Sequence, residues 1–445
     1  MKTIPFFFRP ALAGVLITLL IALLTALALP AHGQEFDREP INYSKSRPDN
    51  RVSRLQERLE AGQATLKFEE PFGYLRSLLR ELQIPPSSQM LVFSKTSLQR
   101  QRISPSTPRA LYFNDDLYVG YCQNGEVLEI SVADPALGAV FYTLEQAAAK
   151  PKITRQGDNC LICHGSSQTR GIPGHLVRSV FPDAAGLPIL SSGSFRIDQT
   201  SPLEQRWGGW YVTGLHGKQK HLGNLVIRGR QEPREVDNSA GMNLLDLGDR
   251  FDKAAYLTPH SDIVALLVLE HQTMGHNLIT RANFLTREAL HYETTLNRQL
   301  AEPAGKQWDS TVSRIKSAGE PLVEYLLFSE EAPLMGRIQG TSVFSQEFVE
   351  KGPRDSQGRS LHEFDLNRRL FRFPCSYLVY SPSFAALPKP VKEYVLRRIG
   401  EVLTGRDQTK AFAHLSANDR LAIKQILLDT LPDLPQYWRG ENKTP

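Results

Sequence analysis

The spacing of apolar residues changes along the chain, and each period predicts a different kind of element. Between residues 110 and 142, apolar positions recur with a period of two and are rich in β-branched and aromatic side chains. This period is typical of antiparallel strands. The Asn124-Gly125 pair inside this region predicts a hairpin turn. The expected strands cover residues 111–113, 117–121, 127–132 and 139–142.

Periods near 3.6 before and after this region predict helices. Two short amphipathic helices are expected ahead of the strands, and from His260 the chain is mainly helical. The first C-terminal pattern runs without proline to about Leu300, and Ser416 and Asp419 form a capping-box pair at the start of the last one. The other expected helices cover residues 55–66, 74–82, 321–328, 390–403 and 417–428.

The middle of the chain, from about residue 150 to residue 240, has many glycines and few long periodic runs. Residues 206–212 and 225–228 predict short strands within it. These patterns together predict an α+β fold, with a small antiparallel sheet region, an irregular segment and a mainly α-helical C-terminal part. The expected divisions are a flexible tether at 34–52, an α/β region with β-hairpins at 53–150, the irregular region at 151–250, and a mainly helical region at 251–445 that packs on it.

The N-terminus predicts a secretory leader. Lys2 and Arg9 precede an apolar run from Ala11 to Leu29, and Ala31-His32-Gly33 has small residues where a signal peptidase cleaves. We therefore expect residues 1–33 to be a signal peptide and the mature protein to be periplasmic or exported. This run of nineteen residues is also long enough to span a bilayer, so an uncleaved anchor in the inner membrane is the alternative.

Composition adds two limits. The chain is 41% hydrophobic, as globular proteins are, and roughly 410 residues after the leader suffice for two or three domains. Its net charge of +5 falls to +3 without Lys2 and Arg9, with both signs interspersed, so we expect no nucleic-acid partner. Cys122 and Cys375 either pair across the fold or stay two buried thiols.

Cys160-Leu161-Ile162-Cys163-His164 carries the clearest chemistry, because it spells C-x-x-C-H. Two thiols on one helical turn form thioethers to the vinyl groups of one porphyrin, and the following imidazole binds its iron. Haem is coupled to this motif outside the cytoplasm, which agrees with the leader. We expect one covalently attached haem c, held by Cys160 and Cys163 with His164 as the proximal ligand, and residues 151–250 as the haem-binding region. A thioredoxin-type pair is the alternative, but no short β-α-β pattern surrounds the motif.

A six-coordinate iron needs a second ligand, usually His or Met. His271 lies on an apolar helical stripe, and His221 lies in a glycine-rich loop, so we expect one of them to be the distal ligand. The alternative for His271 is a core histidine bonded to a carbonyl. Among the other candidates, His175 fits a solvated loop residue better. The remaining ones are His216, Met242 and His276, the last of which lies about 140° round the helix from His271.

Two further groups of residues suit a haem pocket. Trp207 and Trp210 offer rings that pack on the porphyrin, with ordinary core packing as the alternative. Arginines near the motif suit the two propionates, although most of them are expected to be surface charges. These arginines are Arg155, Arg170, Arg178, Arg196 and Arg206. A separate metal site made from His216, His221, His260 and Glu270-His271 has only weak support, because its members lie on several elements.

Nine segments carry a resemblance to known proteins, and they are 109–115, 118–120, 160–165, 207–214, 216–217, 223–224, 261–266, 270–272 and 380–384. Together they resemble a family of exported, largely uncharacterised monohaem cytochrome c domain-containing proteins. The resemblance extends from about residue 90 to residue 405 and implies a single c-type haem and a periplasmic location, without a known substrate. Family members often have Met where this chain has Leu222, which favours His as the distal ligand here.

Two functions follow. The first is an electron-transfer cytochrome that serves a redox partner protein. The alternative is a periplasmic haem oxidoreductase that acts on a small substrate at an open or weakly ligated distal site, and the chain is about four times as long as a shuttle of about a hundred residues needs. Whether the protein is an enzyme is left open by the sequence. A redox or gas sensor is a third class, but the chain has no recognisable output domain.

Overall fold

The computed structural model describes residues 35–147, 150–229, 232, 235–432 and 434–439, so the predicted leader lies outside the described residues. No helix in these described ranges is long and apolar enough to cross a membrane. The strands are β1 (Met90–Val92), β2 (Arg109–Phe113), β3 (Leu117–Tyr121), β4 (Val127–Asp134), β5 (Gly138–Glu145), β6 (Ile153–Gln156), β7 (Arg178–Val180) and β8 (Ser194–Arg196). The helices are α2 (Arg51–Glu60), α3 (Leu75–Glu81), α4 (Asp158–His164), α5 (Ile263–Gln299), α6 (Asp309–Leu326), α7 (Phe344–Lys351), α8 (Pro382–Ala385), α9 (Lys389–Leu403) and α10 (Ala417–Thr430).

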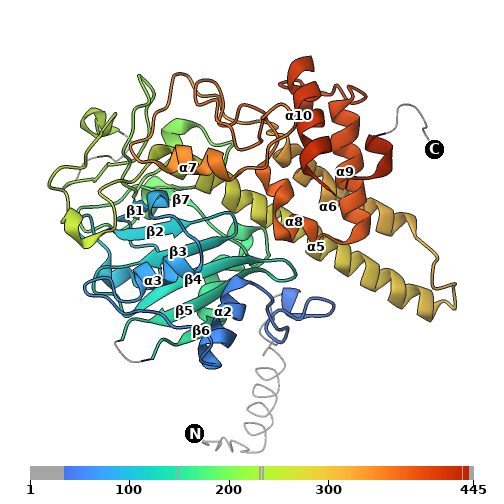
Figure 1. The fold of residues 1–445 in the computed structure, drawn as a ribbon, viewed down its shortest axis with the longest axis horizontal. Helices are drawn as coiled ribbons and strands as arrows, with labels where there is room; N and C mark the ends of the chain where they lie inside the picture. The colour runs from blue at the N-terminus through green and yellow to red at the C-terminus, as the bar shows by residue number, and fades with distance from the viewer. Residues whose placement is uncertain (1–34, 148–149, 230–231, 233–234, 433, 440–445) are drawn as a thin grey trace, which may run out of the picture.

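Strands β1 to β6 form one antiparallel sheet in chain order, which confirms the predicted α+β class with a helical C-terminal part. Every strand is hydrogen-bonded to the strand before it, and β3 and β4 flank the turn that contains Asn124, whose φ is +54°. One face of the sheet is apolar and packs against α2 and α3 (Figure 1). Side chains from this face include Tyr112, Val119, Ile130, Tyr142 and Leu144. The other face carries more polar residues and positions the site described below.

The segment before α2 is packed, which corrects the prediction of a flexible tether over residues 34–52. Phe36, Ile41 and Tyr43 are buried in the cluster under the sheet, and the Tyr43 hydroxyl donates to the carbonyl of Ala139 at 2.7 Å. The segment is polar in composition, but its few apolar side chains suffice to anchor it. Helix α2 begins earlier than predicted because Asn50 caps it, accepting from two of its first N–H groups.

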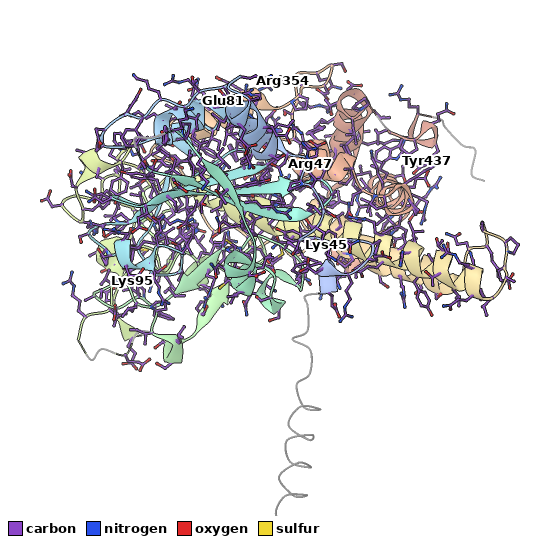
Figure 2. All side chains as sticks on the ribbon, turned by 90° about the horizontal axis from the view of Figure 1, so that it is seen from below. Lys45, Arg47, Glu81, Lys95, Arg354 and Tyr437 are labelled. Atoms are coloured by element: carbon purple, nitrogen blue, oxygen red, sulfur yellow. The ribbon has the colours of Figure 1, made fainter. Side chains whose placement is uncertain are left out.

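Helix α5 is a single element of 37 residues, whereas the proline-free pattern fits either one bent helix or two stacked ones. Its first half is buried at the junction between the sheet and the helical part, while its C-terminal end projects beyond the rest of the molecule (Figures 1 and 2). Helix α6 begins twelve residues before the predicted start at Pro321. Prolines favour the first turn of a helix, but here Ile315 and Ala318 continue a buried stripe that also includes Leu322, and the stripe carries the helix through Pro321.

The strands expected at 206–212 and 225–228 do not form; β7 and β8 pair instead. The Trp-Gly-Gly-Trp segment turns back on itself, with the N–H of Trp210 donating to the carbonyl of Trp207. Gly208 lies so close to β7 that an added Cβ would be 2.2 Å from the Val180 carbonyl oxygen. Gly209 has a φ of +84°, which favours glycine and interrupts an extended strand. The two tryptophans lie in the core, as the core-packing alternative expected.

Candidate functional site

The C-x-x-C-H motif forms α4, which directly follows β6. Leu161 is buried and anchors the helix, while Ile162 is 71% exposed between the two cysteines. Cys160 is half-buried and Cys163 is exposed, and neither forms a disulfide. The short helix therefore presents two unpaired thiols and an apolar side chain at the protein surface.

The ring of His164 has a defined hydrogen bond. Its Nδ1 lies 2.9 Å from the carbonyl oxygen of Gly174, whose own N–H donates to the carbonyl of His164 at 2.8 Å. Because a carbonyl only accepts, Nδ1 carries the proton and Nε2 keeps its lone pair. Burial lowers the pKa of His164, which keeps the ring neutral at neutral pH. This is the tautomer that a metal bond at Nε2 requires.

The polar face of the sheet lies beside α4. Tyr118, Ser131 and Phe141 are direct cross-strand neighbours on β3, β4 and β5, so their side chains share this face. The ring of Phe141 is 4.8 Å from that of His164. The ring of His175 is 4.4 Å from that of Tyr118, and its Nε2 is 2.8 Å from the Ser131 hydroxyl. His175 is thus buried, which corrects its prediction as a solvated loop residue.

A charged pair lies one row further along the same face. Arg109 and Glu129 form an ion pair of 2.6 Å, and the Arg109 guanidinium covers Gly120. Burial, and after it the charge of Glu129, raises the pKa of the Cys160 thiol to about 11. Reactive cysteines of thioredoxin-type pairs have lowered pKa values. The environment of Cys160 therefore argues against that alternative, as does the absence of a β-α-β unit around α4 in the described chain.

The predicted distal candidate His271 is a fully buried residue of α5. Its Nδ1 lies 2.5 Å from the side-chain oxygen of Gln199, and its Nε2 lies 2.7 Å from the Ser376 hydroxyl. Burial lowers its pKa to about 3, so the ring is neutral. A metal bond would cost one of these two buried hydrogen bonds. His271 therefore stays a predicted ligand whose observed contacts are those of a core histidine.

His221 is held in a similar way. Its Nδ1 accepts from the N–H of Gly223 at 3.0 Å, so the proton of the neutral ring is on Nε2. The neighbouring His216, with ring centroids 4.7 Å apart, accepts from the N–H of Asn243 at Nε2 and carries its proton on Nδ1. Within the described ranges, no hydrogen bond or ring contact joins His164 to His221 or His271. His221 also stays a prediction.

The arginines predicted near propionates divide into two groups. Arg155 donates to main-chain carbonyls of Tyr43 and Ser46, and Arg206 forms a buried ion pair with Glu270. Both guanidinium groups therefore already have hydrogen-bond partners within the protein. Of the other three, Arg178 donates to the Ser194 hydroxyl and Arg196 to the Gln168 carbonyl, and none forms an ion pair with a described carboxylate; the third is Arg170. Cys122 and Cys375 are two separate buried thiols, so they do not pair.

Sequence reasoning missed the residues that surround His164. Glu129 was assigned only to an expected strand, Arg109 belonged only to a segment of the family resemblance, and Asn277 was not considered at all. The strand alternation around residue 129 was the one available signal, because a Glu and a Ser at every second position mark a sheet face that is not apolar. Nothing near Gly174 in the sequence points to Asn277.

The surroundings of the motif hold no second constellation of metal ligands. In the part of the chain that the structure describes, no three His, Cys, Asp or Glu side chains are grouped to hold a metal ion, including the predicted His216–His271 set. Two surface hollows of about 470 and 910 Å³ lie elsewhere, between α3 and α7 and beside α10. Comparisons with protein-family models, curated proteins and solved structures find no match to this chain.

Proposed function

We propose that this chain is an exported monohaem c-type cytochrome that transfers electrons. The observation that carries the proposal is the hydrogen bond from His164 Nδ1 to the Gly174 carbonyl, since it leaves Nε2 free on the helix that presents both thiols. A c-type haem, when bound, supplies a one-electron Fe(III)/Fe(II) couple. Cys160 and Cys163 would hold it covalently, and His164 would be the proximal ligand.

Other residues of the same face support this proposal. Phe141 packs against the ring of His164 and limits its rotation. Arg109 has an Nε atom that is buried without a partner, on the sheet face that carries Phe141, and it would be a donor for a haem propionate. The exposed Ile162 offers apolar surface beside the thiols. An electron-transfer protein must bring its cofactor near the surface, and α4 lies there. We expect a redox partner protein.

The test is covalent haem attachment. We expect the full chain, exported in a host that matures c-type cytochromes, to give a c-type pyridine haemochrome with one haem per chain. Cys160→Ala and Cys163→Ala should each lose one thioether, and the double variant should retain no covalent haem. Cys375→Ala is the matched control, because it removes a fully buried thiol far from α4 in sequence and should keep the haem. A wild-type protein without covalent haem contradicts the proposal.

A specific observation favours a second candidate, a periplasmic haem oxidoreductase for a small substrate. Both ring nitrogens of His271 form hydrogen bonds, and Nδ1 of His221 accepts one, which places the proton of that ring on Nε2. With these hydrogen bonds kept, neither ring would offer a lone pair to the iron, and the distal position would be open. Carbon monoxide distinguishes the two candidates. A ferrous spectrum that carbon monoxide changes at once supports the oxidoreductase. A low-spin spectrum that ignores carbon monoxide supports the electron carrier and rejects the second candidate.

A further inference from the structure

Helix α5 holds the loop that carries the hydrogen-bond acceptor of His164. The side chain of Asn277, 1% exposed, donates from Nδ2 to the carbonyl of His175 at 2.7 Å. Its Oδ1 accepts from the N–H of the same residue at 2.8 Å. Both polar atoms of the Asn277 amide are therefore hydrogen-bonded to the main chain of His175, the residue after Gly174. A neighbouring β-strand would pair with the same N–H and carbonyl groups.

Gly174 permits this close approach. A Cβ added to it would lie 2.5 Å from Asn277 Oδ1 and 3.1 Å from the Cβ of Thr169. The first distance is shorter than any real Cβ contact, so a larger residue would displace the loop or the helix. The acceptor of His164 thus lies where α5 and the loop are in direct contact.

Other contacts hold the same loop as well. The N–H of Ala139, in β5, donates to the carbonyl of Pro173 at 3.0 Å. The hydroxyl of Thr169 donates to the carbonyl of Ile172 at 2.7 Å and reaches that of His164 at 3.1 Å. Because β5, Thr169 and Asn277 all bond to this loop, the Gly174 carbonyl has a defined position relative to the imidazole.

We propose that Asn277 is a positioning residue for His164, acting through the Gly174–His175 main chain. This inference rests on the proposed function. A firm Nδ1–H···O bond gives an iron-bound imidazole more basic character, which stabilises the ferric over the ferrous state. Asn277 therefore lowers the reduction potential by holding the acceptor in place. Loosening this contact weakens the hydrogen bond and raises the potential.

The experiment compares Asn277→Leu, which removes both hydrogen bonds at similar volume, with Asn277→Asp, which keeps the acceptor for the His175 N–H. Asn283→Leu is the matched control, because Asn283 is a buried asparagine of the same helix that bonds to the Pro135 carbonyl at 3.3 Å and not to the loop. The haem-loaded full chain is used for redox titration and for denaturant unfolding. We expect the midpoint potential to rise in Asn277→Leu, to rise less in Asn277→Asp, and to stay unchanged in Asn283→Leu.

The outcomes separate positioning from mere stability. If Asn277→Leu and Asn283→Leu lose similar stability and neither potential moves, the inference is overturned. If Asn277→Leu does not fold, the midpoint potential of Asn277→Asp tests the inference, and an unchanged potential overturns it. Absence of covalent haem in the wild type overturns the proposed function instead. In that case, ¹⁵N shifts of His164 in the haem-free protein test the positioning, with the Nδ1–H tautomer expected in the wild type and a mixture in the Asp variant.

Discussion

At the scale of single residues, the same side-chain type has different roles according to its hydrogen bonds. His164 has one nitrogen bonded to a carbonyl, whereas His271 has both nitrogens bonded to side chains. The first arrangement leaves a lone pair for a ligand, and the second fills the bonding capacity of the ring. A substitution of His164 therefore removes a possible metal ligand, whereas a substitution of His271 removes two buried hydrogen bonds.

Replacing His271 tests this difference. In His271→Ala, the partners Gln199 and Ser376 lose their hydrogen bonds and a cavity remains, so we expect the free energy of unfolding to fall by about 3 kcal/mol. The visible spectrum of the haem-loaded protein should stay as in the wild type. The exposed His291→Ala serves as a control and should change neither property. A low-spin spectrum lost only in His271→Ala would identify His271 as the distal ligand.

At the scale of elements, α5 joins the sheet region to the helical part, and its N-terminus depends on one carboxylate. Buried Asp262 accepts at Oδ1 from the N–H of Val264 at 2.8 Å, which caps the helix. At Oδ2 it accepts from the N–H groups of Thr341 and Ser342 at 2.8 and 2.7 Å. One side chain therefore fastens a distant loop to the start of α5.

We expect Asp262→Ala to lower the free energy of unfolding by roughly 3 kcal/mol, because it removes the cap and leaves buried N–H groups unpaired. Ser416→Ala, at the exposed cap of α10, removes a cap without burial and should cost about 1 kcal/mol. Denaturant unfolding of both variants measures the difference. Equal losses would show that the loop contacts of Asp262 contribute nothing.

At the scale of the whole molecule, buried titratable groups of both signs make stability depend on pH. Burial lowers the pKa of His271 and His362 to about 3 and that of His276 to about 4. Burial raises the pKa of Glu270 and Glu331 to about 7. The contribution of the neutral histidines to stability is complete above about pH 6.5 and is lost as the pH falls, because the unfolded state then binds protons that the folded state does not. The contribution of the protonated carboxyls is complete below about pH 4.5 and is lost as the pH rises to about 7.

The histidines and the carboxyls change the stability in opposite directions between pH 4.5 and 6.5. The contribution of one histidine is therefore measured by comparing the wild type with a variant that lacks only that residue. His362→Gln removes a buried ring that the proposed site does not use. The unfolded state binds a proton at about pH 6.5 and the folded state only near pH 3, so the wild type loses stability relative to this variant by about 1.4 kcal/mol per pH unit in that window. Denaturant unfolding from pH 7.5 to 4 measures the difference between the two curves. A difference independent of pH would contradict the neutral state of His362.

Local patterns predicted the local elements well. Alternation across residues 110–142 identified four strands of the sheet, and the proline-free run identified α5. The Trp-Gly-Gly-Trp segment was wrongly predicted to be a strand, because its aromatic residues favour strands. In the structure the close contact of Gly208 with Val180 determines the backbone conformation of this segment. His175 was predicted to be a solvated loop residue, although hydrogen bonds to Ser131 and Asn277 hold it in the interior.

The sequence by itself determined the spacing of Cys160, Cys163 and His164 on one helical turn, since residues so close together are related by local geometry alone. It also determined the alternation that makes a sheet with one apolar face. Only the tertiary structure decided which carbonyl accepts from His164 and that Asn277, 102 residues beyond His175, holds the loop of that carbonyl. The physical reason is that a hydrogen bond between distant segments depends on how the whole core packs, and packing brings α5 to within contact of Gly174.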